Sequence, residues 1–293
     1  MREENESTGR FQMNGYDIRL IALDLDGTTL DSKGRLSART KGTLEAAAKK
    51  GVHVVISTGR AYSALPADVF AIDGLRYILT SNGASVTDIA DGRQVYSNCI
   101  GPEALDRAVA LLRNFDFLME FFIQGRAYVE KSMYDRVEAM NFTEKHRNYI
   151  KKTRQPVANL LDFALRHRAQ VENINVNFEN QADRGMMRGV LATLEGVTLT
   201  TSFDHNLEIG GATTSKAEAI KAICGMLGVA CSEVMACGDS PNDAAMLRAA
   251  GLSVAMGNAK DELKAIAKHV TLTNDDDGVA EAVEAFVLKG RFA

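Results

Sequence analysis

The chain has 293 residues, of which 46% are hydrophobic and 25% are charged, a composition typical of globular proteins. Its formal net charge of −4 argues against a nucleic-acid partner, and no apolar run is long enough for a membrane-spanning helix. The four cysteines form no C-x-x-C pair, as expected of free thiols in a reducing compartment, so we expect a cytoplasmic protein.

The first strand predicted from the sequence ends in two acidic residues. Residues 1–17 are polar and predict a flexible N-terminal tail, and residues 20–23 form an apolar run with the length of a buried strand. Asp24 follows directly and Asp26 comes two residues later. Two carboxylates at a strand end repel each other unless a cation or a shared proton lies between them. A solvated acidic turn is the simpler alternative at this point.

Polar residues also follow the next two predicted strands. A helix capped by Ser37 precedes the apolar run 52–56, and this strand-helix-strand order predicts a parallel sheet. That run ends in Thr58 and Gly59, and the strand 77–80 ends in Ser81-Asn82-Gly83. We expect a helix over residues 61–70. Because ligands bind at the carboxyl ends of parallel strands, these loops are candidate binding segments.

The C-terminal third of the chain repeats this pattern. Residues 206–209 predict a core strand, followed by a Gly-Gly-Ala-Thr-Thr-Ser loop and a helix that begins at Lys216. Residues 234–237 predict another buried strand, which is followed by Asp239 and Asp243. Acids, a hydroxyl group and a lysine are therefore predicted to gather at one edge of a parallel sheet.

The middle of the chain has a different pattern of apolar and polar residues. Residues 115–122 and 171–178 alternate between apolar and polar side chains, which predicts antiparallel strands with one face covered and one face wet. Asp91-Gly92 predicts a hairpin turn. The length suggests two domains, so we interpret residues 86–199 as an inserted α/β domain that covers the open end of the core. Within it we expect three helices, at residues 102–114, 157–167 and 181–194.

The gathered residues indicate phosphate chemistry. Their ligand atoms are all oxygens, which favours Mg²⁺, and the five histidines show no metal-binding spacing. Lys216 and Thr58 would bind a phosphoryl group beside such an ion. A carboxylate can act as the nucleophile by forming an acyl phosphate, a role that suits Asp24. Asp26 is then placed to donate and accept the proton.

These residues carry a family resemblance. Asp24-Leu25-Asp26-Gly27-Thr28, Thr58-Gly59-Arg60, Lys216 and Gly238-Asp239-Ser240-Pro241-Asn242-Asp243 resemble, in this order, the four motifs of the haloacid dehalogenase-like phosphohydrolases. The insert between the second and third motifs is similar to the α/β cap of the Cof-type subfamily. Asn82-Gly83-Ala84 and Asp277-Gly278-Val279-Ala280 resemble further landmarks of that subfamily. One departure is Ala217, where the family pattern has a glycine after the lysine.

The resemblance implies a Rossmann-like parallel core, residues 18–85 and 200–293, with the cap at 86–199. It implies Asp24 as nucleophile and Asp26 as general acid and base. Phosphate-binding roles are implied for Thr58, Gly59 and Lys216, with Asn82 and Asn242 as secondary contacts. The implied Mg²⁺ ligands are the Asp24 carboxylate, the Asp26 backbone carbonyl, Asp239 and Asp243.

The expected function is a Mg²⁺-dependent phosphatase that hydrolyses small-molecule phosphomonoesters, with sugar phosphates as the leading substrates. We expect a monomer or weak homo-oligomer. A phosphomutase with the same core is one alternative, because the catalytic residues do not distinguish the two outcomes. A receiver-like signalling module, which also carries phosphate on an aspartate, is the alternative from another class. Such a module needs neither a second acid like Asp26 nor an inserted domain.

Overall fold

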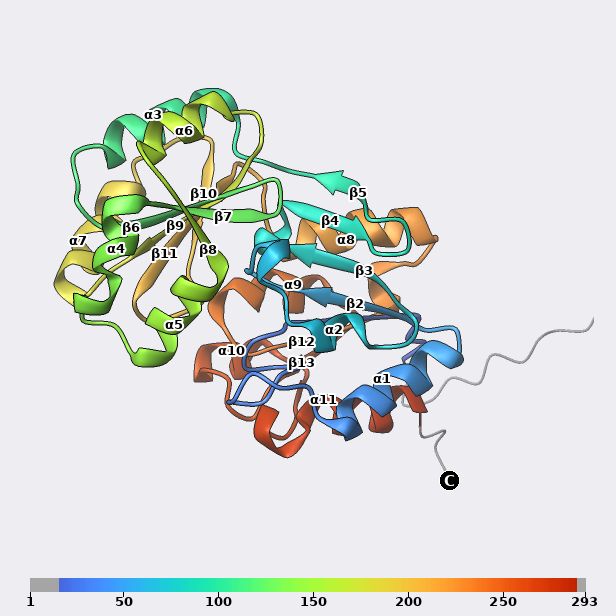
Figure 1. The fold of residues 1–293 in the computed structure, drawn as a ribbon. Helices are drawn as coiled ribbons and strands as arrows, with labels where there is room; N and C mark the ends of the chain where they lie inside the picture. The colour runs from blue at the N-terminus through green and yellow to red at the C-terminus, as the bar shows by residue number, and fades with distance from the viewer. Residues whose placement is uncertain (1–15, 289–293) are drawn as a thin grey trace, which may run out of the picture.

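The core lobe is built around the apolar strand β1 (Leu20–Leu23), whose four residues are all buried. In this computed structural model, which describes residues 16–288, β1 lies inside an eight-stranded sheet of order β14-β13-β12-β1-β2-β3-β4-β5 (Figure 1). The parallel strands beside β1 are β2 (His53–Ser57), β3 (Leu75–Thr80), β12 (Val234–Gly238), β13 (Leu252–Ala255) and β14 (His269–Val270). The predicted parallel α/β core is therefore confirmed.

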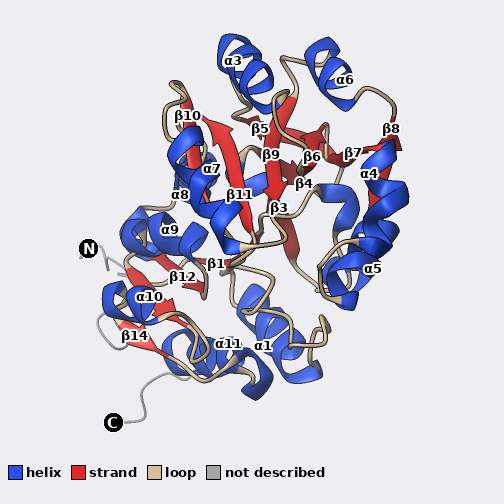
Figure 2. Ribbon diagram, turned by 90° about the vertical axis from the view of Figure 1, so that its left-hand side faces the viewer, coloured by secondary structure: helices blue, strands red, loops and turns tan. Residues whose placement is uncertain are grey.

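Helices cover the core sheet on both sides. Helix α1 packs beside α11, and α8 packs beside α9; Figure 2 shows these two pairs on opposite sides of the sheet. Ser37 caps α1 as expected, because its side chain accepts a hydrogen bond from the backbone N–H of Thr40. The helices of this lobe are α1 (Ala38–Lys49), α2 (Ala67–Phe70), α8 (Lys216–Leu227), α9 (Ala244–Ala249), α10 (Asp261–Ile266) and α11 (Gly278–Val283).

The cap lobe is a six-stranded sheet of order β10-β11-β9-β6-β7-β8. One face is apolar and packs under helices, through residues such as Phe121, Ile174 and Ile209. The strands are β6 (Leu118–Ile123), β7 (Arg126–Glu130), β8 (Arg154–Val157), β9 (Val171–Asn177), β10 (Val197–Thr200) and β11 (Asn206–Gly211). The helices are α3 (Pro102–Leu112), α4 (Lys131–Arg136), α5 (Glu144–Thr153), α6 (Leu160–Arg166) and α7 (Gln181–Leu191).

The polar face of the cap sheet is not wet. Every residue of β6 and β9 is buried, including Glu120, Asn173 and Asn175. Alternation predicts which side chains share a face, but the core lobe and the cap's own residues supply the cover on the polar side. The cap's polar face therefore lies where it can take part in a site.

Sheet pairing corrects both predicted boundaries of the insert. Strands β4 (Ser85–Asp88) and β5 (Arg93–Ser97), with the predicted Asp91-Gly92 turn between them, form a hairpin that extends the core sheet antiparallel to β3. Strand β11, expected in the core, instead lies between β10 and β9 in the cap sheet. By strand pairing the insert runs from about residue 98 to about residue 212. The two connections to the core lie together, because the Thr214 hydroxyl donates to the carbonyl of Asn98 over 2.6 Å.

Prolines shorten two predicted helices. The stretch 61–70 holds a 3₁₀ turn (Tyr62–Ala64) and the short α2, separated by Leu65 and Pro66. The residue before a proline is driven out of the helical region, and Leu65 is accordingly extended. The helix expected from residue 157 begins at residue 160, because Pro156 continues strand β8.

The predicted N-terminal tail lies mostly outside the described residues. Residues 1–15 of the predicted tail lie outside the described residues, whereas Tyr16 packs edge-on against Phe286 at a centroid distance of 6.3 Å. Within residues 16–288 no helix has the length and apolar character needed to cross a membrane.

The boundary correction predicts which deletion leaves a folded core. Replacing residues 99–212 with Gly-Gly should preserve cooperative urea unfolding, because the remaining ends, Asn98 and Thr213, are hydrogen-bonded to each other at 3.2 Å. Deleting residues 86–199 should not, because it removes β5 and leaves β11 without its neighbours β9 and β10. Circular dichroism during urea titration checks both variants. Equal cooperativity in the two would contradict the corrected boundaries.

Candidate active site

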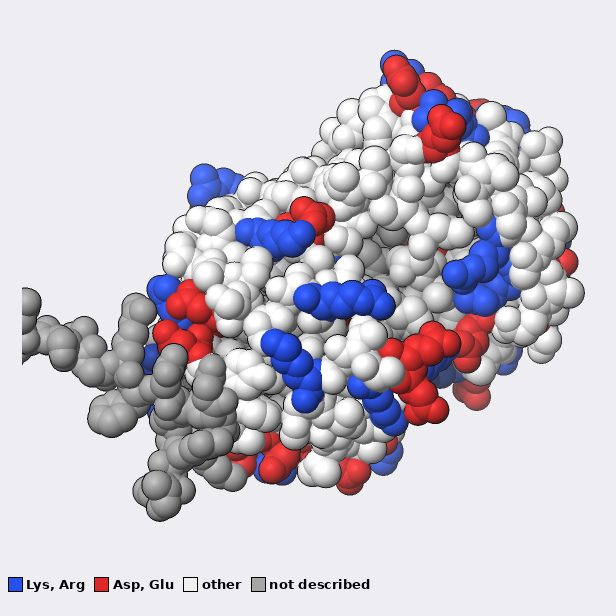
Figure 3. Space-filling model, turned by 180° about the vertical axis from the view of Figure 1, so that it is seen from behind, with Lys and Arg blue, Asp and Glu red and all other residues white. Residues whose placement is uncertain are grey.

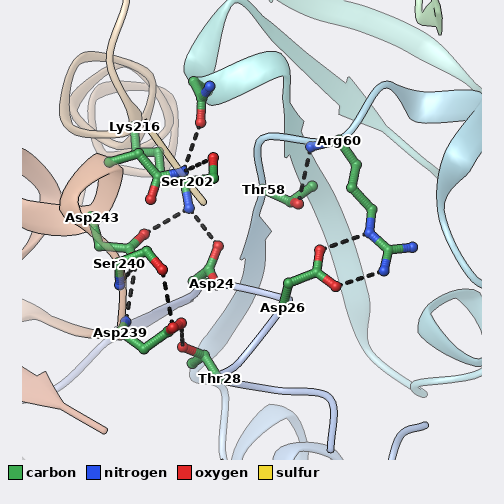
Figure 4. A network of polar contacts seen from close by, with 12 residues as sticks. Asp24, Asp26, Thr28, Thr58, Arg60, Ser202, Lys216, Asp239, Ser240 and Asp243 are labelled. Atoms are coloured by element: carbon green, nitrogen blue, oxygen red, sulfur yellow. Dashed lines mark hydrogen bonds and ion pairs between the residues drawn. The ribbon is translucent and has the colours of Figure 1, made fainter. Parts of the chain in front are cut away.

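Loops at the carboxyl edge of the core sheet bring the predicted site residues together (Figure 4). Strands β2, β1 and β12 are parallel neighbours, so the loops that follow them emerge side by side. Helix α8 starts at the same edge. The residues that meet there are Asp24, Asp26, Thr58, Lys216, Asp239 and Asp243.

Lys216 is the buried cation of the site. Its Nζ atom lies 2.5 Å from Oδ1 of Asp24 and 2.6 Å from Oδ1 of Asp243, and its side chain is fully buried. Burial disfavours the charged ammonium, but the two carboxylates outweigh that effect and raise the pKa of Lys216. Burial also raises the pKa of Asp24 well above its usual range; Asp243 raises it further, while Lys216 lowers it. Lys216 therefore stays charged and holds Asp24 in place.

Asp239 completes an acidic cluster. Its carboxylate accepts hydrogen bonds from the hydroxyls of Thr28 (2.9 Å) and Ser240 (3.0 Å). Burial, followed by the neighbouring Asp243, raises the pKa of Asp239 to about 6. Gly27, at φ +78°, is required beside it, because a Cβ there would lie 2.6 Å from an Asp239 oxygen.

The acidic cluster fits a divalent cation. Carboxylate oxygens of Asp24, Asp239 and Asp243 lie within 4.8 Å of one another. Three carboxylates against the single Lys216 ammonium leave two formal negative charges, which a divalent cation would neutralise. The donors are all oxygens, which is the ligand set that Mg²⁺ prefers. Within residues 16–288, these three aspartates form the one group of acidic, histidine or cysteine side chains that lie close enough together to share an ion.

Asp26 points to a different partner. Its two carboxylate oxygens accept hydrogen bonds from Nε (2.7 Å) and Nη2 (2.6 Å) of Arg60 (Figure 4). This bidentate pair is geometrically specific and half-exposed, unlike the Lys216 cluster. The Arg60 guanidinium also lies over the ring of Tyr149 from the cap, 5.3 Å from its centroid. Asp26 is thus beside the acidic cluster, with its carboxylate free of it.

The proposed phosphate-binding residues lie around the same edge. Thr58 is buried, and its hydroxyl accepts a hydrogen bond from the backbone N–H of Arg60 at 3.2 Å. A Cβ on Gly59 would lie 3.0 Å from Oδ1 of Asn82, so the two loops touch there. Asn242 donates to that same oxygen over 3.0 Å.

Sequence reasoning missed several residues of the site. Arg60 has no predicted role, although its place directly after Thr58-Gly59, at the neighbouring strand end, is a usable signal for a contact with Asp26. The predicted boundary at residue 200 places Ser202 and Glu208 in the core, but both belong to the cap and contact core asparagines. Their pattern carried no signal for this contact, because strand partners are decided by long-range pairing.

Comparison with known proteins shows the family to which the chain belongs. The sequence profile of the haloacid dehalogenase-like hydrolases matches residues 21–283. The phosphatase YwpJ of Bacillus subtilis is 31% identical over 91% of this chain and 99% of its own length. The 5-amino-6-(5-phospho-D-ribitylamino)uracil phosphatase YcsE of the same organism is 29% identical over 94% of this chain and 99% of its own.

Solved structures show the same fold. A haloacid dehalogenase-like hydrolase from B. subtilis superposes with a TM-score of 0.79 at 28% identity, covering 91% of this chain and 99% of that one. A haloacid dehalogenase-like hydrolase from Bacteroides thetaiotaomicron gives a TM-score of 0.75 at 27% identity, covering 91% and 98%.

The buried ion pairs predict a large effect of replacing Lys216. Lys216→Met should lower the free energy of unfolding by about 3–5 kcal/mol at neutral pH, because it leaves buried carboxylates without their cation. Urea denaturation of the ion-free protein measures this loss. Lys221→Met is the matched control on the same helix: Lys221 pairs with Glu218 at the surface, so its loss should stay within about 0.5 kcal/mol. Equal losses in the two variants would contradict the assignment.

Proposed function

The chain belongs to the haloacid dehalogenase-like hydrolase family, and from that premise we propose that it is a Mg²⁺-dependent phosphatase acting through an aspartyl-phosphate intermediate. It is a phosphoric monoester hydrolase, as its named relatives are. The observation that carries the finer proposal is the buried Asp24–Lys216–Asp243 cluster, with Asp239 close enough to share a cation.

Asp24 is proposed as the nucleophile. One of its oxygens attacks phosphorus, the ester P–O bond breaks, and the phosphoryl group is then bonded to Asp24. Lys216, held against Asp24, lies beside the developing negative charge. Mg²⁺ bound by the carboxylates of Asp24, Asp239 and Asp243 and the Asp26 carbonyl would supply further neutralisation and would orient the phosphoryl oxygens.

Asp26 is proposed as the general acid and base. In its protonated form it gives its proton to the leaving oxygen; as a carboxylate it then takes a proton from the water that attacks phospho-Asp24. The products are the alcohol and inorganic phosphate, and both aspartates return to their starting state. Asp26 lies outside the acidic cluster, and because Arg60 occupies both of its oxygens, proton transfer requires that this pair open when substrate binds.

The phosphoryl oxygens are proposed to bind donors from separate loops. Thr58, Gly59, Asn82 and Asn242 line the same sheet edge as Lys216. The donors are neutral apart from Lys216, so most of the positive charge at this site comes from that residue and the cation. Such a site suits a single phosphate group.

Small-molecule phosphomonoesters, with sugar phosphates first, are the proposed substrates. YcsE is named for an ester of a ribityl chain, so polyol phosphates belong in the same test. A panel of sugar, polyol and nucleotide monophosphates, assayed for inorganic phosphate with Mg²⁺, tests this proposal. Release of inorganic phosphate separates a phosphatase from a phosphomutase, which would return the phosphoryl group to its substrate.

We propose that the protein works in the cytoplasm, as a monomer or weak homo-oligomer, on small molecules rather than on nucleic acid or membranes. All four cysteines are free thiols, which suits a reducing compartment. On the face shown in Figure 3, Lys and Arg side chains are interspersed with Asp and Glu rather than gathered into one basic patch.

The raised pKa of Asp239 predicts a pH-dependent effect of Mg²⁺. Hydrolysis should stop in EDTA and return with Mg²⁺. Because Mg²⁺ binds ionised carboxylates, a proton on Asp239 competes with it as the pH falls through about 6. The rise in melting temperature on adding Mg²⁺ should therefore be larger at about pH 7.5 than at about pH 5.5. Full activity in EDTA, or an equal rise at both pH values, would contradict the metal site.

The proton-transfer role of Asp26 predicts a burst. An activated ester such as p-nitrophenyl phosphate needs little acid catalysis, so Asp26→Asn should still phosphorylate Asp24. Hydrolysis of phospho-Asp24 lacks its base, so it should slow by about 10²–10⁴-fold and become limiting. Stopped-flow measurement should show about one nitrophenolate per site followed by a slow steady rate.

Two controls accompany this experiment. Asp24→Asn should show neither burst nor turnover. Asp31→Asn should behave like the unmodified protein, because Asp31 is paired with Arg35 outside the cluster. A normal steady rate in Asp26→Asn would remove Asp26 from the mechanism and favour a receiver-like module.

A further inference from the structure

Four hydrogen bonds form a closed ring between the two lobes. Glu208 of the cap accepts a hydrogen bond at Oε2 from Nδ2 of Asn82 in the core (3.0 Å) and another from the hydroxyl of Ser202 in the cap (2.8 Å). Nδ2 of Asn242, in the core, donates to Oδ1 of Asn82 (3.0 Å) and to the hydroxyl oxygen of Ser202 (3.1 Å). The ring thus holds two residues of each lobe, and two of its hydrogen bonds, Asn82–Glu208 and Asn242–Ser202, cross between cap and core.

The ring lies directly against the proposed phosphate-binding loop. A Cβ on Gly59 would be 3.0 Å from Oδ1 of Asn82 and 3.4 Å from the Ser202 hydroxyl. Asn242 lies between Asp239 and Asp243 in the sequence, on the turn that carries both acids. Cap residues therefore reach the place where phosphoryl oxygens are proposed to bind.

The turn that carries Asn82 needs support. Ser81 (φ 53°) and Asn82 (φ 56°) are two successive non-glycine residues in the left-handed region, and Gly83 follows at φ 98°. Such residues cost on the order of 1–3 kcal/mol each and persist only where surrounding contacts hold them. The cap supplies contacts here: Glu172 accepts a hydrogen bond from the Ser81 hydroxyl at 2.7 Å, and Glu208 holds the Asn82 amide.

The same turn packs closely against the start of α8. A Cβ on Gly83 would lie 2.2 Å from the carbonyl oxygen of Ser215, the residue before Lys216. The turn is thus fixed between the cap carboxylates on one side and the Lys216 backbone on the other. A change in the cap contact would therefore move this turn, and with it the residues that line the proposed phosphate site.

We infer that Glu208 and Ser202 are positioning residues: Glu208 orients the amide of Asn82 directly, and Ser202 does so through Asn242, whose two Nδ2 protons are both used within the ring. The phosphoryl-binding site is then complete only when the cap lies against the core. This inference rests on the proposed function, because it assigns a phosphate to that site. Neither residue touches the reacting atoms; both act through the two asparagines.

Glu208 accepts both of its ring hydrogen bonds as a buried side chain, and this allows a test with a neutral replacement. Burial raises the pKa of Glu208, and the Ser202 and Asn82 hydrogen bonds only partly offset this. Both hydrogen bonds end on one oxygen, so the carbonyl oxygen of a glutamine could accept them equally well. Glu208→Gln should therefore keep the ring, whereas Glu208→Ala leaves the donors of Asn82 and Ser202 without their acceptor.

The test measures the binding of inorganic phosphate to the full-length protein with Mg²⁺ by titration calorimetry, together with kcat and KM for p-nitrophenyl phosphate. Glu208→Ala and Ser202→Ala should weaken phosphate binding by about tenfold or more, since each breaks buried hydrogen bonds. Glu208→Gln should stay within about threefold of the unmodified protein. Glu195→Ala, at an exposed loop of the cap, is the control and should change nothing.

The possible outcomes distinguish failure of this inference from failure of the proposed function. Normal phosphate binding in Glu208→Ala and Ser202→Ala, even with a lower melting temperature, would show a merely structural ring and overturn the inference alone. Loss of binding in Glu208→Gln equal to that in Glu208→Ala would also overturn it, because charge rather than hydrogen bonding would then matter. Unmodified protein that neither binds phosphate nor hydrolyses the ester would overturn the proposed function itself.

Discussion

The buried ammonium of Lys216 is the interaction on which the site depends. Asp24, Asp239 and Asp243 come from two neighbouring strand ends, and the parallel sheet forces their carboxylates together whether or not an ion is present. Lys216 compensates one of the three charges and holds Asp24 and Asp243 at hydrogen-bond distance. The two remaining formal negative charges fit the divalent cation that we propose for this site.

The two acids of the first loop lie in different environments, which suit the two roles proposed for them. Asp24 is buried beside a lysine, and its pKa is raised. Asp26, two residues later, is half-exposed and paired with Arg60. A nucleophile benefits from fixed orientation near the cations, whereas a proton carrier benefits from access to the leaving oxygen and to water. The loop after β1 supplies both environments within three residues.

The amphipathic cap sheet connects stability to function. Its apolar face holds the lobe together under α3, α6 and α7, which leaves the polar face to meet the core. Glu208 projects from that polar face onto the strained turn at Ser81 and Asn82, and Glu172, at the register shift between β6 and β9, contacts the same turn. The alternation that builds the cap sheet therefore also brings the Glu208 carboxylate to the proposed phosphate-binding edge.

The sequence by itself determined the parallel core and which acidic residues meet at its carboxyl edge. Apolar runs that end in Asp24 and Asp239 mark the strands and their carboxyl ends, and parallel strands must bring those ends to one edge. The tertiary structure alone decided that the 85–97 hairpin extends the core sheet and that 206–211 joins the cap sheet. Edge strands of either sheet carry similar local patterns, so their partner is fixed by long-range pairing. The Asp26–Arg60 pair and the ring through Glu208 likewise depend on loop conformations and lobe contacts that no local pattern encodes.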